Sequence, residues 1–188
     1  MYKTLSNTIS SADYLFEKSK VYRSTETYPK GKLGKDFKQI AELIISGSDT
    51  QIYYLTIGGF DTHSNQVNQQ NKLFKNYSEA LAAFVRDLKK NDHWNDSLIM
   101  TFSEFGRRVA ENGSKGTDHG KANNLYLMGG SIKKAGFYNQ GPNLNQLDNG
   151  DLSFEIDFRR VYANILNDWL QTDSASILQQ SFNSLGIV

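Results

Sequence analysis

Two polar loops carry most of the side chains in this sequence that could do chemistry. The first, GGFDTHSNQ, places Asp61 close to His63 behind two glycines, and the second, GTDHG, places Asp118 beside His119. Carboxylates and imidazoles are common ligands of divalent metal ions, and the glycines permit the tight backbone that such loops need. Each pair also has a purely structural interpretation, with Asp61 capping the following helix and the second pair forming a turn.

A third polar stretch, SEFGRR, adds residues that could act on a bound substrate. Glu104 could be a metal ligand, a general base or an ion-pair partner of a nearby arginine. Arg107 could bind a phosphate, sulfate or carboxylate through its guanidinium group, and Lys121 is a weaker candidate for the same role. The competing interpretation makes all of them solvated surface charges.

The composition limits the classes of protein that the chain can belong to. A chain of 188 residues with 38% hydrophobic content is long enough for one domain with a real core. A net charge of +1 gives no reason to expect nucleic acid as a partner, and no apolar run is long enough to span a membrane. The first residues lack the apolar core of a secretory signal. Because cysteine is absent, a metal would be held by carboxylates, histidines, amides or hydroxyls.

The elements that must position these residues begin after a polar stretch. We interpret residues 1–34 as a polar arm and residues 35–188 as the α/β domain that carries the site loops. Apolar residues at helical spacing predict a helix from about Phe37 to Ile45, which ends at Ser-Gly-Ser. The run QIYYLTI, 51–57, then predicts a buried strand.

A strand–helix–strand pattern defines the fold class. The apolar face of residues 67–90 predicts a long helix, and SLIMTF, 97–102, predicts a second buried strand. Such a βαβ unit favours parallel neighbouring strands, and therefore an α/β fold with a mostly parallel sheet flanked by helices. Residues 124–129 could add a strand, and 130–156 have the composition of a loop. A last amphipathic helix is predicted for 158–170, with Asp157 as its N-cap.

This organisation predicts where the chemistry lies. Ligands of open α/β sheets collect at the carboxyl ends of the strands. If strands 51–57 and 97–102 are parallel neighbours, Asp61, His63 and Glu104 emerge at the same edge of the sheet.

Three motifs in this order also carry a resemblance to a known family. GGFDTHSNQ, then SLIMTFSEFGRRVAENGSKGTDHGKAN, then DFRRVYANILNDWL resemble the C-terminal half of the bacterial family called domain of unknown function 1501. The resemblance runs from about residue 35 to about residue 170. It implies membership of the alkaline-phosphatase-like and sulfatase-like superfamily, whose members hydrolyse phosphate or sulfate esters with divalent metal ions at the edge of a parallel sheet.

The resemblance also implies that part of the catalytic machinery lies elsewhere. Members of the superfamily hold the nucleophile and one metal-binding Asp in an N-terminal strand and loop, and residues 1–34 have no counterpart of that segment. We therefore expect an incomplete, C-terminal portion of the full fold, either a fragment of a longer protein or a short member that has lost the nucleophile half. On this expectation the chain is either inactive alone, because the nucleophile segment is absent, or dependent on a separate chain that supplies the missing half. Family members are often exported, so the resemblance implies a periplasmic or exported protein.

Two alignments of the metal ligands are open. In the first, Glu104 replaces the Asp that ends the corresponding strand of the superfamily, and His119 is a later ligand. In the second, Asp118-His119 is the displaced Asp-His pair. We favour the first alignment because Glu104 directly follows a strand.

The sequence thus leads to two hypotheses. One is a metal-dependent hydrolase-like domain acting on phosphate or sulfate esters, with Zn, Mn or Ca held by Asp61, His63, Glu104, Asp118 and His119, and with Glu104 and Arg107 as catalytic groups. The alternative is a non-catalytic exported domain that binds a partner or polymer, in which the same residues serve only the structure.

Overall fold

The computed structural model describes residues 2–188, with side chains from Ile9 onward, so Met1 of the predicted arm lies outside the described residues. The chain divides into two compact units. Among the described residues, one comprises 2–62 and Val67–Trp94, and the other comprises His63–Gln66 and Asn95–Val188. No helix among the described residues is long and apolar enough to cross a membrane.

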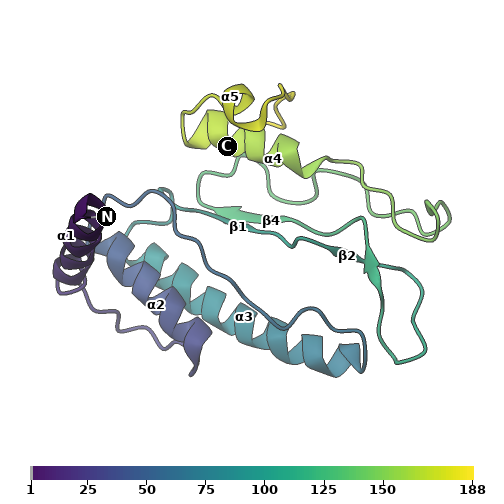
Figure 1. Cartoon of the computed structure of the whole chain (residues 1–188), viewed down its shortest axis with the longest axis horizontal. Coiled ribbons are helices and arrows are strands. Elements are labelled where there is room, and N and C mark those ends of the chain that lie inside the picture. The colour runs from purple at the N-terminus through teal and green to yellow at the C-terminus, as the bar shows by residue number, and fades with distance from the viewer. Residues whose placement is uncertain (1) are drawn as a thin grey trace. The chain divides into compact units, whose positions relative to one another are not determined.

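The first unit is built from three helices, α1 (Tyr2–Lys18), α2 (Lys32–Ile45) and α3 (Gln66–Lys90) (Figure 1). The predicted helices near 37–45 and 67–90 are therefore confirmed. The α2 helix ends where predicted, because Gly47 adopts the left-handed φ of +67° and the Ser48 N–H donates to the Leu43 carbonyl.

The core of the first unit lies between α2 and α3. The Phe37 and Phe84 rings are 5.3 Å apart between centroids, and Leu88 is fully buried. Removing each such side chain from water stabilises the fold by roughly 1.5–3 kcal/mol. Two members of the apolar stripe that predicts α3 from the sequence, Tyr77 and Phe84, thus pack against Phe37 of α2.

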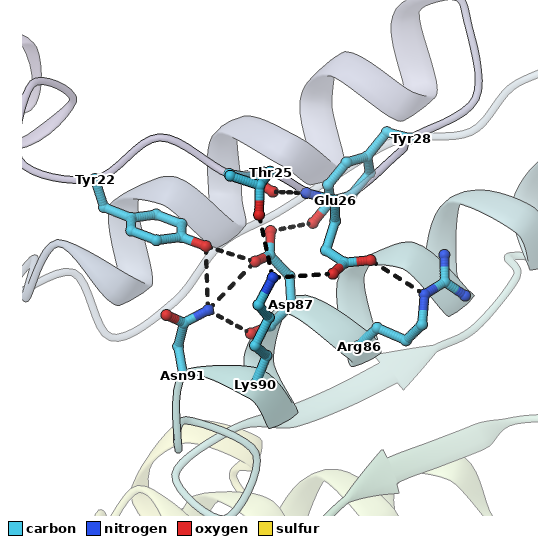
Figure 2. Close-up of polar contacts among 9 residues, drawn as sticks. Tyr22, Thr25, Glu26, Tyr28, Arg86, Asp87, Lys90 and Asn91 are labelled. Carbon is cyan, nitrogen blue, oxygen red and sulfur yellow. Dashed lines mark hydrogen bonds and ion pairs between the residues drawn. The ribbon is translucent and has the colours of Figure 1, made fainter.

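A buried carboxylate fastens residues 20–28 to α3 (Figure 2). Asp87 is completely buried, and its two oxygens accept hydrogen bonds from Tyr22 Oη and Tyr28 Oη, each at 2.9 Å. The Asn91 side-chain amide donates to Tyr22 Oη at 3.1 Å. A buried charge is tolerated only when donors surround it, so this network fixes the path of the segment before α2.

The second unit contains a long, irregular hairpin in two parts. Strand β1 (Leu98–Thr101) pairs antiparallel with β4 (Tyr126–Gly129), and β2 (Gly106–Arg107) pairs antiparallel with β3 (His119–Gly120) (Figure 1). The strands predicted near 97–102 and 124–129 are confirmed. Because Thr101 lies opposite Tyr126, the segments leading to β2 and from β3 leave the same end of this ladder.

The predicted α/β fold with a mostly parallel, alkaline-phosphatase-like sheet is wrong. Among residues 2–188 the only sheets are these two small antiparallel ones. Residues 51–57 are extended, and within the described chain their backbone forms no β-ladder, although Tyr53, Leu55 and Ile57 are half-buried in alternation. The prediction failed because a β-rich run followed by a helix does not determine which strand the run pairs with.

The C-terminal region completes the second unit. Helix α4 (Phe158–Asn164) begins at Asp157, whose carboxylate accepts from the Arg159 N–H at 2.9 Å, so the predicted N-cap is confirmed. The helix continues as the π-helix η1 (Ile165–Trp169), and α5 (Ser174–Leu178) follows. The buried Asn164 side chain accepts from the Ile187 N–H at 3.0 Å, which ties the C-terminal residues to α4.

Candidate metal site

The short β2–β3 pair positions His119. Arg107 lies directly opposite His119, and Gly106 lies opposite Gly120. A Cβ atom on Gly106 would stand 1.8 Å from the Ala122 carbonyl oxygen, so only glycine allows the two chains to approach this closely. The Phe105 ring stacks on the His119 ring at 3.9 Å between centroids, with 10° between the planes. The imidazole is therefore held on one face by an aromatic ring.

The loop between β2 and β3 wraps around residues 63–66 and brings His63 to the same place. The Ser114 and Lys115 carbonyls accept from the Asn65 and Gln66 N–H groups at 3.1 and 3.0 Å. Asn112 organises this loop, since its side-chain oxygen accepts from the Ser114 and Gly116 N–H groups. Its amide nitrogen donates to the His63 carbonyl at 3.0 Å. These bonds join two segments that are far apart in the sequence.

The two histidines form the centre of the candidate site. Their ring centroids are 4.9 Å apart, and they offer ligand nitrogens within 4.8 Å of each other, both on exposed side chains. Asp61 is the third candidate ligand of this group. It precedes His63 by one intervening residue, so the chain itself keeps its carboxylate within reach of an ion on His63. Two imidazoles and one carboxylate form a donor set that suits zinc and related ions.

Asp118 contacts a histidine instead of joining the ligand group. Its Oδ1 lies 3.4 Å from His63 Nδ1 and 3.4 Å from the Asn112 amide nitrogen. The hydrogen bond from Asn112, followed by that from His63, lowers the pKa of Asp118 below its usual value. A carboxylate that accepts from Nδ1–H leaves the Nε2 lone pair of the same ring for a metal ion. The structure thus places Asp118 where it can orient His63.

Glu104 is apart from the histidine pair. It lies exposed in the bend between β1 and β2, and within residues 2–188 no ion pair or side-chain hydrogen bond involves it. It is not a member of the Asp61, His63 and His119 group. The structure therefore does not bring this carboxylate together with the other predicted ligands.

The two predicted anion contacts differ in their surroundings. Arg107 shares one face of the β2–β3 pair with His119, because residues directly opposite each other in an antiparallel ladder project to the same side. Its Nη1 donates to the Thr117 carbonyl at 2.6 Å, and its guanidinium carbon lies 5.1 Å from the Phe105 ring centroid. Lys121 instead forms an ion pair with Asp148. Arg107 is accordingly the better placed of the two.

Two residues of the site were missed by the sequence analysis. Phe105, which touches both His119 and Arg107, is an aromatic residue inside an otherwise polar stretch. Asn112 precedes Gly113, a pair typical of tight turns, and this signal could have identified it as the residue that shapes the loop.

The comparison with protein families agrees with the resemblance of the three motifs. The model of the family described as protein of unknown function (DUF1501) matches residues 20–178, and the chain therefore belongs to this family. The match includes both histidines and all four strands. No curated protein and no solved structure matches the chain.

Proposed function

We propose that Asp61, His63 and His119 bind one divalent metal ion and that the bound ion serves the hydrolysis of phosphate or sulfate esters. The observation that carries the proposal is the approach of the two imidazoles, whose ligand nitrogens lie within 4.8 Å of each other. Since two of the three donors are imidazoles, zinc fits better than manganese or calcium, which prefer oxygen ligands.

The set of donors favours a catalytic over a structural ion. Three protein ligands leave at least one coordination position open, as in catalytic zinc sites, whereas structural sites are closed by four. An ion here would supply a Lewis acid for a phosphoryl or sulfuryl oxygen. The chain's own residues would orient the ligands and the substrate: Asp118 holds His63, Phe105 holds His119, and Arg107 binds the anionic oxygens.

The remaining parts of the proposal rest on the family resemblance. Glu104 stays the candidate general base on its residue type alone, because its exposed carboxylate is not a member of the histidine group. The nucleophile would be supplied by another polypeptide segment that corresponds to the N-terminal half of the family. The protein would act after export.

Metal analysis of the purified protein tests the first step. We expect about one zinc ion per chain by mass spectrometry of metals, and a large loss of affinity in His63→Ala and His119→Ala, as removing a ligand should cause. His93→Ala is the matched control, because His93 is the remaining histidine and is not a member of the ligand group. Equal zinc content in all three variants would contradict the metal site.

Turnover tests the second step. The zinc-loaded protein, with and without a polypeptide that supplies the missing half, would be assayed with aryl phosphates and aryl sulfates. We expect Arg107→Ala to reduce kcat/KM by about 10²-fold or more, the size of effect seen when a group stabilising transition-state charge is lost. A protein that binds zinc with the same affinity but turns over neither ester would support the alternative of a non-catalytic binding domain.

A further inference from the structure

A second candidate ligand site lies in the first unit, at the N-terminal half of α2. A cavity of about 280 Å³ opens there between the segment after α1 and the exposed side of the helix. Its lining consists of Ser19, Arg23, Lys35, Lys38, Gln39 and Glu42. The volume is close to the lower end of the range for small-molecule pockets, roughly 300–1,000 Å³. The cavity therefore suits a small group and not a large cofactor.

The charges around this cavity are unbalanced. Three cationic side chains line it, and Glu42 is its only acid. The Glu42 side chain is 8% exposed and already accepts from the Ser24 N–H at 3.0 Å and from Arg23 Nη1 at 3.3 Å. Lys38 Nζ is 4.0 Å from the same carboxylate. One buried carboxylate thus anchors two cations whose outer surfaces remain in solvent.

Lys35 has no such partner. Within the described chain no ion pair or side-chain hydrogen bond involves the Lys35 ammonium group, although it lines the same cavity. Concave surfaces lined by one sign of charge concentrate the field and attract ions of the opposite sign. Arg23 offers a guanidinium fork, Lys35 and Lys38 offer point charges, and Gln39 offers an amide N–H, which together form a donor set for an oxyanion.

We infer that this cavity binds the tetrahedral oxyanion of a phosphate or sulfate group, between Arg23 and the two lysines. Glu42 lies at the base of the cavity, where its carboxylate accepts from Arg23 and from the Ser24 N–H, so its negative charge offsets part of the positive charge of the lining. This site is independent of the candidate metal site, since none of its residues belongs to the histidine group. The inference does not depend on the proposed hydrolysis.

The test uses metal-free protein, freed of chelator by dialysis, so that a metal-bound anion does not contribute. Isothermal titration would be carried out with inorganic phosphate, inorganic sulfate and phenyl phosphate. We expect saturable binding of one anion per chain. Tighter binding of phenyl phosphate than of the free ions would assign the site to an anionic group on an organic molecule, and tighter binding of a free ion would assign it to that ion.

Two pairs of variants separate this site from a general effect of net charge. Lys35→Ala is expected to weaken phosphate binding about tenfold, as the loss of one charge-assisted hydrogen bond should, whereas Lys72→Ala should change it by less than about twofold. Lys72 is an exposed lysine of α3 that does not line the cavity. Glu42→Gln should tighten binding by freeing positive charge, whereas Glu79→Gln on α3 should not.

The inference is overturned if phosphate, sulfate and phenyl phosphate all fail to bind saturably, or if Lys35→Ala and Lys72→Ala weaken binding equally. Circular dichroism of each variant shows whether its helices are intact. Because Lys35 is exposed, its substitution should leave the fold unchanged.

Discussion

Removing a single oxygen from Tyr28 tests whether the buried Asp87 carboxylate is what holds residues 20–28 on α3. In Tyr28→Phe the ring stays, but Asp87 Oδ2 loses the donor at 2.9 Å, which is its only donor among the described residues. Hydrogen bonds to charged groups contribute about 1.5–3 kcal/mol, and a buried acceptor left without a donor keeps its desolvation cost. We therefore expect a loss of about 1.5–3 kcal/mol in the free energy of unfolding.

The expected change in melting temperature follows from this free energy. For a chain of this size each kcal/mol corresponds to about 2–4 °C, so Tyr28→Phe should lower Tm by about 3–12 °C. Urea unfolding followed by circular dichroism gives the free energy directly. Tyr126→Phe is the matched control, because the Tyr126 side chain is 58% exposed and forms no such bond. A Tyr28→Phe protein within about 0.5 kcal/mol of the control would refute the role of the network.

Three further predictions concern ionisation, ligand orientation and backbone approach. Burial, followed by the hydrogen bond to the buried carboxylate, raises the pKa of Tyr28 above its usual range. As the pH rises, the unfolded chain therefore loses the Tyr28 hydroxyl proton before the folded chain does, and the free energy of unfolding falls above about pH 10. Tyr28→Phe should reduce that fall, as measured by urea unfolding between about pH 8 and pH 11. Asp118→Asn should weaken zinc binding about tenfold by removing the partner of His63, and an unchanged Kd would exclude that role. Gly106→Ala should lower the free energy of unfolding by about 1–3 kcal/mol and weaken zinc binding, because the added Cβ would meet a backbone carbonyl at 1.8 Å. Gly113→Ala, whose Cβ would meet nothing within 4 Å, should do neither, and similar behaviour of the two variants would count against the close approach.

The helices could be predicted from the sequence because their information is local. The apolar stripe that predicts 67–90 is the face of α3 that buries Phe84 and Leu88, and Asp157 caps α4 by contacting a residue close to it in the chain. Strand pairing is not local in this sense. Residues 98–101 form a strand as predicted, but their partner is the segment 126–129 in the antiparallel sense, and nothing in the β-rich composition of either segment specifies that choice.

The sequence predicts that His63 and His119 lie near one ion, but the structure brings them together for a different reason. From the sequence we expected the site residues at the carboxyl edge of a parallel sheet, and residues 2–188 form no such sheet. The histidines approach instead because the loop between β2 and β3 closes around residues 63–66 through Asn112 and backbone hydrogen bonds. Side-chain-to-backbone bonds of this kind depend on the folded path of the loop, so residue types and spacing alone do not reveal them.

The extended segment 51–57 has a consequence for the protein in concentrated solution. It contains no charged residue and no proline, it is rich in β-branched and aromatic residues, and Ile52 and Tyr54 are 68% and 76% exposed. Stretches of six or seven residues with this composition are those that stack into cross-β fibrils. Fibril formation should therefore begin at these residues, and a lysine in place of Ile52 should delay the rise of thioflavin fluorescence.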